Sequence, residues 1–126
     1  MNKSRSFIFA TGLPAAAAAA ALEALRVIDD EPFLISQLWA RRARMADGLA
    51  ALGWSLQASQ SPIFPLLLGS ADKALQAQAN LWDAGYFVPA IRPPTVPAGA
   101  CRLRLTVSAA HSDAQIDGLL QALGRH

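Results

Sequence analysis

The feature that most constrains the fold is a proline-rich segment followed by an alternating one, between residues 91 and 111. Residues 92–99 contain three prolines, which fix φ and remove backbone donors, so this segment cannot join a helix or a central strand. Residues 102–107 alternate charged or hydroxyl residues with apolar ones, which is the period of a half-buried strand. The sequence therefore predicts a stiff loop that leads into a strand with one face on a core.

The polar side chains of this strand share one face. The odd-numbered residues of 103–107 are apolar, so we expect them to face the core. Arg102 and Arg104 then lie together on the other face, beside the loop that carries Arg92 and Thr95. Arginine suits an anion site because its planar fork donates two parallel hydrogen bonds to a carboxylate. Arginines on a strand face are also often solvated or paired with surface acids, and the residues alone leave that alternative open.

Composition narrows the class of protein. The 126 residues are enough for one domain with a core, and 53% hydrophobic with 16% charged residues predicts a globular chain that is poor in surface charge. The net charge of +2 comes without a lysine-rich run of the kind that follows nucleic acid. A single cysteine, Cys101, is typical of a reducing, cytoplasmic compartment. The histidines, His111 and His126, offer no metal-ligand spacing, so we expect no metal site.

The first thirty residues allow two interpretations. Lys3 and Arg5, followed by an apolar, alanine-rich run, resemble a secretory signal peptide or a short membrane segment. The interpretation that we favour is a strand at residues 7–10, a turn, and a helix over residues 15–28 with Pro14 in its first turn. Small alanine side chains suit a crowded interior or a subunit interface, and we expect no membrane partner.

After this lead-in strand and helix, the predicted order is α-β-β-α-β-β-α. Helices are expected over residues 32–52, 70–84 and 112–123, and strands over residues 54–58, 63–68, 86–90 and 102–107. Pro65 within the second of these strands favours an edge position or a bulge. Leu75, Ala79 and Trp82 are expected to face inward from the middle helix. The pattern predicts an α/β fold in which helices cover a small sheet.

The residues offer binding groups without a recognisable catalyst. There is no glycine-rich phosphate loop, no nucleophile elbow and no Cys/His pair suited to covalent catalysis. His111 lies where a strand gives way to a helix, so we interpret it as a turn or capping residue rather than a general base. Neither Lys3 nor Lys73 is expected in the desolvated pocket that a Schiff-base lysine needs. The arginines within residues 41–44 are interpreted as mostly a solvated helix face.

A family resemblance is carried by two runs, Ala90-Ile-Arg-Pro-Pro-Thr-Val-Pro-Ala-Gly99 and Arg102-Leu-Arg-Leu-Thr-Val-Ser-Ala-Ala-His111. They resemble the C-terminal signature of the 8-amino-7-oxononanoate synthases, which belong to the pyridoxal-phosphate-dependent α-oxoamine synthases. Residues 6–14, residues 61–65 and the helix that contains residues 113–120 resemble the same family. The resemblance therefore covers essentially the whole chain.

The resemblance implies that this chain is the C-terminal portion of a fold-type I enzyme that uses pyridoxal phosphate (PLP). Residues 1–30 would be the end of the large PLP-binding domain, and residues 31–126 would be the small C-terminal domain. The family joins L-alanine to a pimeloyl thioester with loss of CO₂, in biotin biosynthesis. It acts as a homodimer with active sites at the subunit interface, so the expected partner is a second subunit or the missing N-terminal portion.

The resemblance also implies roles for particular residues. Thr11 would contact the cofactor phosphate of the partner subunit. Thr95 would line the substrate site, and Arg104, assisted by Arg92, would hold the substrate carboxylate. The sequence departs from the family at Ala10, where relatives often carry a hydroxyl residue, so one phosphate contact is expected to be absent.

The resemblance assigns no catalytic residue to this chain. The Schiff-base lysine, the aspartate on the pyridine nitrogen and the histidine that stacks on the ring all precede Met1 in the family. Without them we expect the chain alone neither to hold the cofactor nor to be active. The rival interpretation is a non-enzymatic α/β module in which Arg92, Arg102 and Arg104 capture a carboxylate or phosphate ligand.

Overall fold

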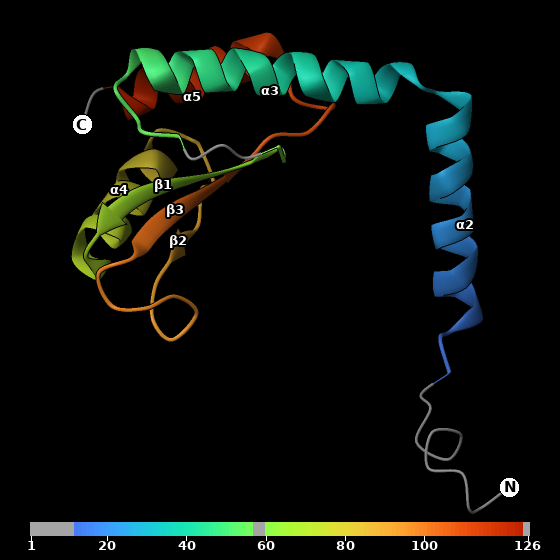
Figure 1. Cartoon of the computed structure of the whole chain (residues 1–126), viewed down its shortest axis with the longest axis horizontal. Helices are drawn as coiled ribbons and strands as arrows, with labels where there is room; N and C mark the ends of the chain where they lie inside the picture. Colours follow the sequence, from blue (N-terminus) through green and yellow to red (C-terminus); the bar gives the residue numbers. More distant parts are fainter. Residues whose placement is uncertain (1–11, 57–59, 125–126) are drawn as a thin grey trace, which may run out of the picture. The chain divides into compact units, whose positions relative to one another are not determined.

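The computed structural model describes residues 12–56 and 60–124. Figure 1 shows its elements, which in chain order are α2 (Ala15–Asp30), α3 (Phe33–Ala51), β1 (Ile63–Gly69), α4 (Ala71–Asp83), β2 (Ala90–Ile91), β3 (Cys101–Thr106) and α5 (Asp113–Leu123). The chain divides into two compact units, residues 1–34 and residues 35–126. The strand expected at residues 7–10 lies outside the described residues.

The first unit contains α2, which confirms the helix predicted over residues 15–28 and ends two residues later. Pro14 precedes the helix, and its carbonyl accepts from the Ala18 N–H at 3.1 Å, as expected for a proline at a helix start. None of the residues of α2 is buried. Its exposed large apolar side chains are Leu22, Leu25, Val27 and Ile28. Within its own unit, α2 therefore has no buried face.

The second unit is built on a three-stranded antiparallel sheet in the order β1-β3-β2. The central strand is β3, with Leu103 opposite both Leu66 of β1 and Ala90 of β2. The proline-rich residues 92–100 connect β2 to β3. The loop and the strand that the sequence predicted are thus both confirmed, and the strand lies at the centre of the sheet.

Strand β1 is an edge strand, as Pro65 predicted. The N–H of Val107 donates to the carbonyl of Pro62 at 2.9 Å, and bonded and non-bonded pairs alternate along an antiparallel ladder. Pro65, three residues on, lies opposite Arg104 in a non-bonded pair, so its nitrogen points to the outer edge. The pairing also shifts after Leu67, which is the irregularity of a bulge.

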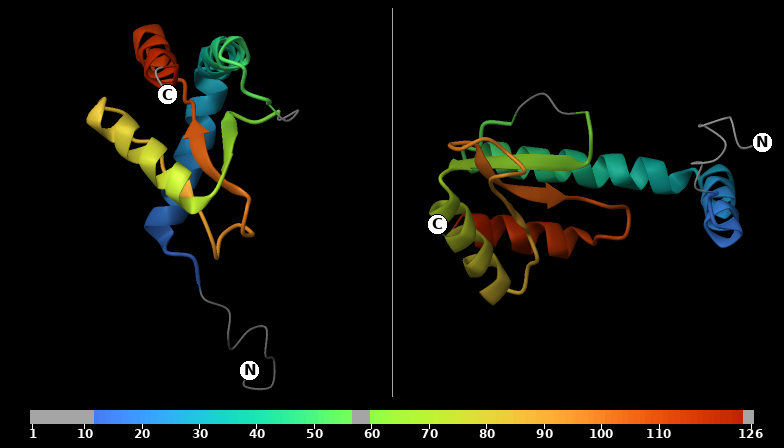
Figure 2. Two further views of the ribbon diagram at one scale, coloured as in Figure 1. Left: turned by 90° about the vertical axis from the view of Figure 1, so that its left-hand side faces the viewer. Right: turned by 90° about the horizontal axis from the view of Figure 1, so that it is seen from below.

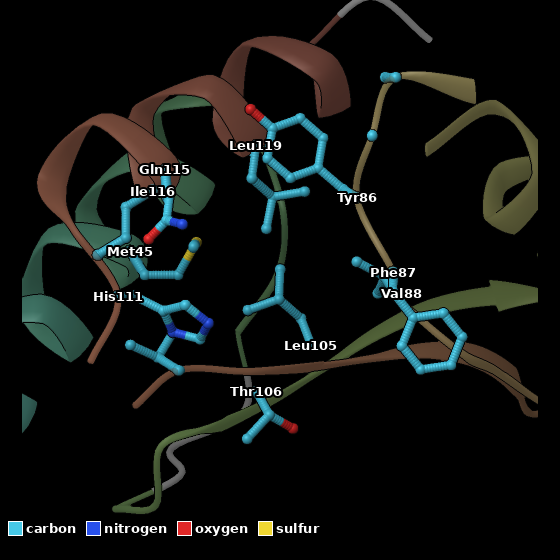
Figure 3. Close-up of a pocket in the computed structure, with 13 residues that line it drawn as sticks. Met45, Tyr86, Phe87, Val88, Leu105, Thr106, His111, Gln115, Ile116 and Leu119 are labelled. Carbon is cyan, nitrogen blue, oxygen red and sulfur yellow. The ribbon is translucent and has the colours of Figure 1, made fainter. Parts of the chain in front are cut away.

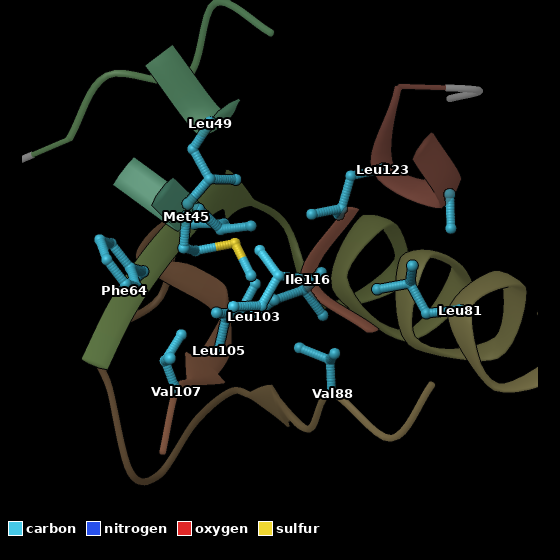
Figure 4. Close-up of a cluster of buried hydrophobic side chains, with 12 residues drawn as sticks. Met45, Leu49, Phe64, Leu81, Val88, Leu103, Leu105, Val107, Ile116 and Leu123 are labelled. Carbon is cyan, nitrogen blue, oxygen red and sulfur yellow. The ribbon is translucent and has the colours of Figure 1, made fainter. Parts of the chain in front are cut away.

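Three helices pack their apolar side chains on one face of the sheet. Figure 2 shows α4 and α5 on the same side of the strands, and Figure 4 shows the side chains that converge there. The buried core consists of Met45, Leu49, Phe64, Leu66, Leu81, Val88, Leu103, Leu105, Val107, Ile116, Ala122 and Leu123. Burying a side chain of this kind stabilises the fold by roughly 1.5–3 kcal/mol, so this face supplies most of the stability of the unit.

The strand predicted over residues 54–58 is wrong where it can be judged, because residues 54–56 are in no strand and residues 57–59 lie outside the described residues. Trp54 instead donates its N–H to the carbonyl of Leu49 at 3.0 Å. Gly53, with φ of 82°, makes the left-handed turn that this closure of α3 requires. The backbone groups that a strand would need are therefore used by the end of the helix.

The strand predicted over residues 86–90 is shorter than expected, since β2 contains only Ala90 and Ile91. The N–H of Tyr86 donates to the carbonyl of Leu81 at 2.8 Å, which extends the closure of α4. Helix termination again takes residues that the apolar pattern assigned to a strand.

Helix α4 turns a different face to the sheet from the one predicted. The three side chains that were expected to face inward are exposed: Leu75, Ala79 and Trp82. The buried positions are Ala74 and Leu81, and Gln78 accepts a hydrogen bond from the Ala90 N–H at 2.7 Å. This face combines Leu81 with the small Ala74 and the polar Gln78, and the Gln78 bond to β2 is a contact that hydrophobicity alone does not predict.

Helix α5 begins at the predicted capping box. Ser112 Oγ accepts from the Gln115 N–H at 3.2 Å, and the Ser112 N–H donates to Gln115 Oε1 at 2.8 Å. Further along the helix, a Cβ at Gly118 would collide with the hydroxyl oxygen of Tyr86. This glycine therefore allows the close approach of α5 to the segment that leads into β2.

Candidate functional site

The second face of the sheet stays exposed, and we call it the open face. It is formed by Ile63, Pro65, Leu67, Ile91, Arg102, Arg104 and Thr106. Ile63 is 41% and Leu67 is 48% exposed. On this face the sequence correctly placed both arginines of β3 opposite the core.

Each arginine of β3 lies between apolar residues of the neighbouring strands. Arg102 is opposite Leu67 of β1 and Ile91 of β2, and Arg104 is opposite Pro65 of β1. Side chains that are directly opposite on one face have Cβ atoms about 5 Å apart. The arginine stems can therefore pack on an apolar strip while their guanidiniums stay in water.

The proline-rich loop holds the other two predicted substrate residues, Arg92 and Thr95, in one turn. The N–H of Thr95 donates to the carbonyl of Arg92 at 3.1 Å, and the peptide bond between the two prolines that separate them is cis. Both residues are exposed. Because Ile91 pairs with Arg102, the turn begins at the same end of the sheet as Arg102.

Arg92, Arg102 and Arg104 have donors to spare. In the part of the chain that the structure describes, none of them makes an ion pair. Arg102 Nε donates to the carbonyl of Ala100 at 2.9 Å, which uses one of its five N–H donors. The hairpin of β2 and β3 thus gathers three arginines at one face and its adjoining turn, an arrangement suited to carboxylates.

The arginines of α3 are engaged within the protein, so the solvated face predicted for residues 41–44 is wrong for Arg42. Arg42 Nε donates to the carbonyl of Ser61 at 3.2 Å. Its guanidinium carbon lies 5.8 Å from the ring centroid of Trp39 and 5.5 Å from that of Phe64, within the range of a cation–π interaction. Arg42 therefore joins α3 to the start of β1.

Arg44 is exposed, as the predicted solvated face requires, and it also joins α3 to α5. Its Nε and Nη2 donate to the two carboxylate oxygens of Asp117 at 2.8 and 2.6 Å. The hydrogen bond from Arg44 holds the pKa of Asp117 below its usual range, and the same bond raises the pKa of Arg44. These two arginines support the fold rather than a ligand site.

A cavity of about 430 Å³ lies on the core side of the sheet (Figure 3). Leu105 and Leu119 are among the side chains that converge on it, whereas Thr106 extends away, toward the open face. His111 lines the cavity, and its Nδ1 accepts from the Ser108 N–H at 3.0 Å. Its ring is thus bonded to its own turn, which agrees with the interpretation of His111 as a turn residue.

Residues 12–56 and 60–124 contain neither a metal-binding cluster nor a membrane-spanning helix. No group of three or more His, Cys, Asp and Glu side chains there could hold a metal ion. No helix in these two ranges is both long enough and apolar enough to cross a membrane.

The residues available for PLP do not fit a covalent site. Thr11, predicted to contact its phosphate, lies outside the described residues. The described ranges contain a single lysine, Lys73, which is exposed in the first turn of α4. A Schiff-base lysine needs a desolvated environment, and Lys73 does not have one.

The apolar members of the open face were not identified from sequence. Residues 63–68 are almost continuously apolar, so their pattern does not show which side chains face the core. Pairing with β3 decides this, because partners opposite each other point to the same face. The alternation in β3 was the usable signal, but only once its partner strands were known.

Comparison with known proteins defines the class. Residues 1–123 match the family model described as aminotransferase class I and II, so the chain belongs to this family. The chain is 56% identical over 126 residues to a putative 8-amino-7-oxononanoate synthase of Desulforudis audaxviator. It is 52% identical over 123 residues to the 8-amino-7-oxononanoate synthase of Anaeromyxobacter dehalogenans. These matches cover 99% and 98% of this chain but 32% and 31% of the relatives.

Solved structures confirm the expected fold class, the C-terminal part of a fold-type I PLP enzyme. A serine palmitoyltransferase from S. paucimobilis, with a bound PLP–myriocin aldimine, matches with a TM-score of 0.83 at 29% identity, over 93% of this chain and 30% of that one. The 8-amino-7-oxononanoate synthase of Francisella tularensis matches with a TM-score of 0.78 over 98% of this chain and 36% of that one. At 22% identity, the second match shows the fold alone.

Proposed function

We propose that this chain provides the carboxylate-binding part of a PLP-dependent acyltransferase of the 8-amino-7-oxononanoate synthase type. The reaction joins L-alanine to a pimeloyl thioester and releases CO₂ and the free thiol. One observation carries the proposal: Arg92, Arg102 and Arg104 gather, without acidic partners in the described residues, at an exposed sheet face and its adjoining turn. The high identity to named synthases supports this reaction over others of the family.

Arg104 holds the carboxylate of L-alanine in this proposal, Arg92 assists it from the turn, and Thr95 lines the same site. A hydrogen bond to a charged group contributes roughly 1.5–3 kcal/mol. Fixing the carboxylate also fixes the direction of the bond between it and Cα, which is the bond that breaks. These residues therefore bind and orient the amino acid, and none of them transfers a proton.

The proposal includes the rest of the enzyme. Residues 1–30 belong to the end of the large domain, residues 31–126 form the small domain, and Thr11 contacts the cofactor phosphate of the partner subunit. The exposed apolar side chains of α2 favour packing against protein outside this chain, either the large domain or a second subunit of a homodimer. The complete enzyme acts in biotin biosynthesis in the cytoplasm.

The chain alone is expected to be inactive, because Lys73 is the only lysine of the described ranges and lies exposed on a helix. Purified chain mixed with PLP, L-alanine and pimeloyl-CoA should give neither an absorbance band of a bound cofactor nor the ketone product. Formation of either would contradict this part of the proposal.

A chimera tests the function directly. The corresponding last third of the Anaeromyxobacter dehalogenans synthase is replaced by this chain, and synthase activity is measured. The chimera should be active, and Arg104→Gln should lower kcat/KM for L-alanine by about 10- to 100-fold, from the loss of one charged hydrogen bond. Arg41→Gln, which removes the same charge from α3, is the matched control. An active chimera in which Arg104→Gln behaves like Arg41→Gln would contradict the proposal.

A second candidate function is a non-enzymatic module that binds carboxylate or phosphate. It is favoured by the exposure of both Arg92 and Arg104. Calorimetric titration of the chain with small acids separates the two functions. Micromolar affinity of the lone chain would favour the module, whereas an incomplete enzyme site should bind far more weakly.

A further inference from the structure

The proposed function leaves one of the three arginines without a role. Arg104 and Arg92 take the carboxylate of the amino acid, and Arg102 remains. The acyl donor in the same reaction is a half-thioester of a dicarboxylic acid, so it brings a second carboxylate at the far end of a methylene chain. A charge of this kind needs a cationic partner when it leaves water.

The position of Arg102 suits the second carboxylate of the acyl donor. Arg102 and Arg104 are two residues apart on the same face of β3, so their Cα atoms are about 6.5 Å apart along the strand. Two carboxylates can therefore be bound side by side without competing for one guanidinium. Arg102 is half-buried, and its bond from Nε to the carbonyl of Ala100 at 2.9 Å limits the directions in which its remaining donors can point.

The neighbours of Arg102 suit the methylene chain. Leu67 of β1 and Ile91 of β2 lie directly opposite it on the open face, and Leu67 is 48% exposed. Methylene groups gain free energy by leaving water for an apolar surface. Arg102 thus combines a charge with an apolar surround, which distinguishes an alkyl carboxylate from a small inorganic anion.

We infer that Arg102 binds the distal carboxylate of a dicarboxylic acyl substrate, and that Leu67 and Ile91 pack against its methylene chain. This inference rests on the proposed function, since it names the feature by which the same site selects its acyl donor. It makes Arg102 a specificity-determining residue and leaves the amino acid to Arg104.

The test uses the intact 126-residue chain labelled with ¹⁵N and three probes, heptanedioate, heptanoate and L-alanine, at constant ionic strength. The Nε–H resonances of the arginines are followed by NMR. Heptanedioate should shift the resonances of both Arg102 and Arg104, and it should bind about tenfold more tightly than heptanoate, the increment of one charged hydrogen bond. L-alanine should shift Arg104 and leave Arg102 in place.

Variants isolate the second carboxylate. Arg102→Gln should reduce the affinity for heptanedioate to that for heptanoate, and leave the response of Arg104 to L-alanine unchanged. The affinity of Arg102→Lys for heptanedioate should lie between those of the parent and of Arg102→Gln, because lysine keeps the charge but loses the planar fork. Arg41→Gln lowers the net charge equally and should change nothing. Urea unfolding of each variant verifies that the fold is retained.

The outcomes separate the two hypotheses. A tenfold preference for heptanedioate that survives Arg102→Gln, or one that Arg41→Gln removes equally, would overturn the role of Arg102. An Arg102 resonance that does not shift with heptanedioate, in a chain whose Arg104 responds to L-alanine, would also overturn the role of Arg102 and would leave the proposed function standing. If L-alanine shifts neither Arg104 nor Arg92, the proposed amino acid site itself is wrong.

Discussion

Strand β3 allows a direct comparison between the covered face and the open face of one sheet. On the covered face, Cys101, Leu103, Leu105 and Val107 are at most 3% exposed. On the open face, one residue away in each case, Arg104 and Thr106 are exposed and Arg102 is half-buried. The covered face supplies stability, and the open face carries groups that the fold does not need. Substitutions on the covered face should therefore change the free energy of unfolding, and substitutions on the open face should change ligand binding instead.

The largest expected effect comes from adjacent leucines of β1 that point to opposite faces. Leu66→Ala should lower the free energy of unfolding by about 2–5 kcal/mol, because Leu66 is 1% exposed and its loss leaves a cavity. Leu67→Ala should change it by no more than about 0.5 kcal/mol, since Leu67 is 48% exposed. Urea unfolding monitored by circular dichroism measures both. Equal effects would mean that the open face is covered in solution.

Gly118 gives the next largest effect, on the covered side. Alanine is normally favoured over glycine in a helix by about 1 kcal/mol, but here its Cβ would collide with the Tyr86 hydroxyl. Gly118→Ala should therefore destabilise the chain by about 1–3 kcal/mol, as overpacking does. In a Tyr86→Phe background the same change should become neutral or stabilising. Additive free energies in this double-mutant cycle would contradict the contact.

Two arginines extend the comparison: Arg42, which contacts Phe64 of the covered face, and Arg104 of the open face. Arg42→Gln should cost about 1–2 kcal/mol of unfolding free energy, because it removes contacts with the Trp39 and Phe64 rings and a bond to Ser61. Arg104→Gln should cost no more than about 0.5 kcal/mol while it weakens carboxylate binding. Thermal unfolding measures the first effect and anion titration the second. A large loss of stability in Arg104→Gln would make Arg104 a structural residue.

The smallest effect concerns pH and the pair of Arg44 and Asp117. The folded chain holds the pKa of Asp117 below its unfolded value, so the unfolded state binds more protons in acid. The contribution of the pair is therefore complete above pH about 4, the unfolded pKa, and is lost as pH falls through the folded pKa. Asp117→Asn should be slightly less stable than the parent at pH 7, and the difference should vanish in stronger acid.

The control for this pH dependence is Asp83→Asn, since Asp83 makes no ion pair in the described residues. Urea midpoints are compared across pH 7 to 2 for the parent and both variants. A constant difference between the parent and Asp117→Asn over this range would show that the pair does not set the acid dependence.

The sequence predicted those parts of the fold that depend on local pattern. The alternation in residues 102–107 placed β3 and both of its faces, and the spacing of Ser112 and Gln115 placed the start of α5. Pro65 placed β1 at an edge, because its missing donor is a local property. The α/β class and the shared face of Arg102 and Arg104 followed from these segments.

The failures arose where helix closure or tertiary contacts override the apolar pattern. The apolar residues around Trp54 and Tyr86 suit strands, but their N–H groups are used to close α3 and α4. The inward face of α4 depends on the bond from Ala90 to Gln78, which no helical periodicity contains. Arg42 looked solvated because its aromatic neighbour Phe64 is distant in the sequence. The first two errors concern how a helix ends, and the errors at α4 and Arg42 required knowledge of a partner from another element.

Pro65 has a consequence for how this protein meets other chains. A free sheet edge with regular amides can recruit a strand from another molecule and start aggregation. Pro65 leaves a gap in the outward row of donors on β1, and the opposite edge, β2, is only two residues long. Neither border of the sheet can readily template a neighbour, so productive association is directed to side-chain surfaces, where partners can be selected by shape and charge.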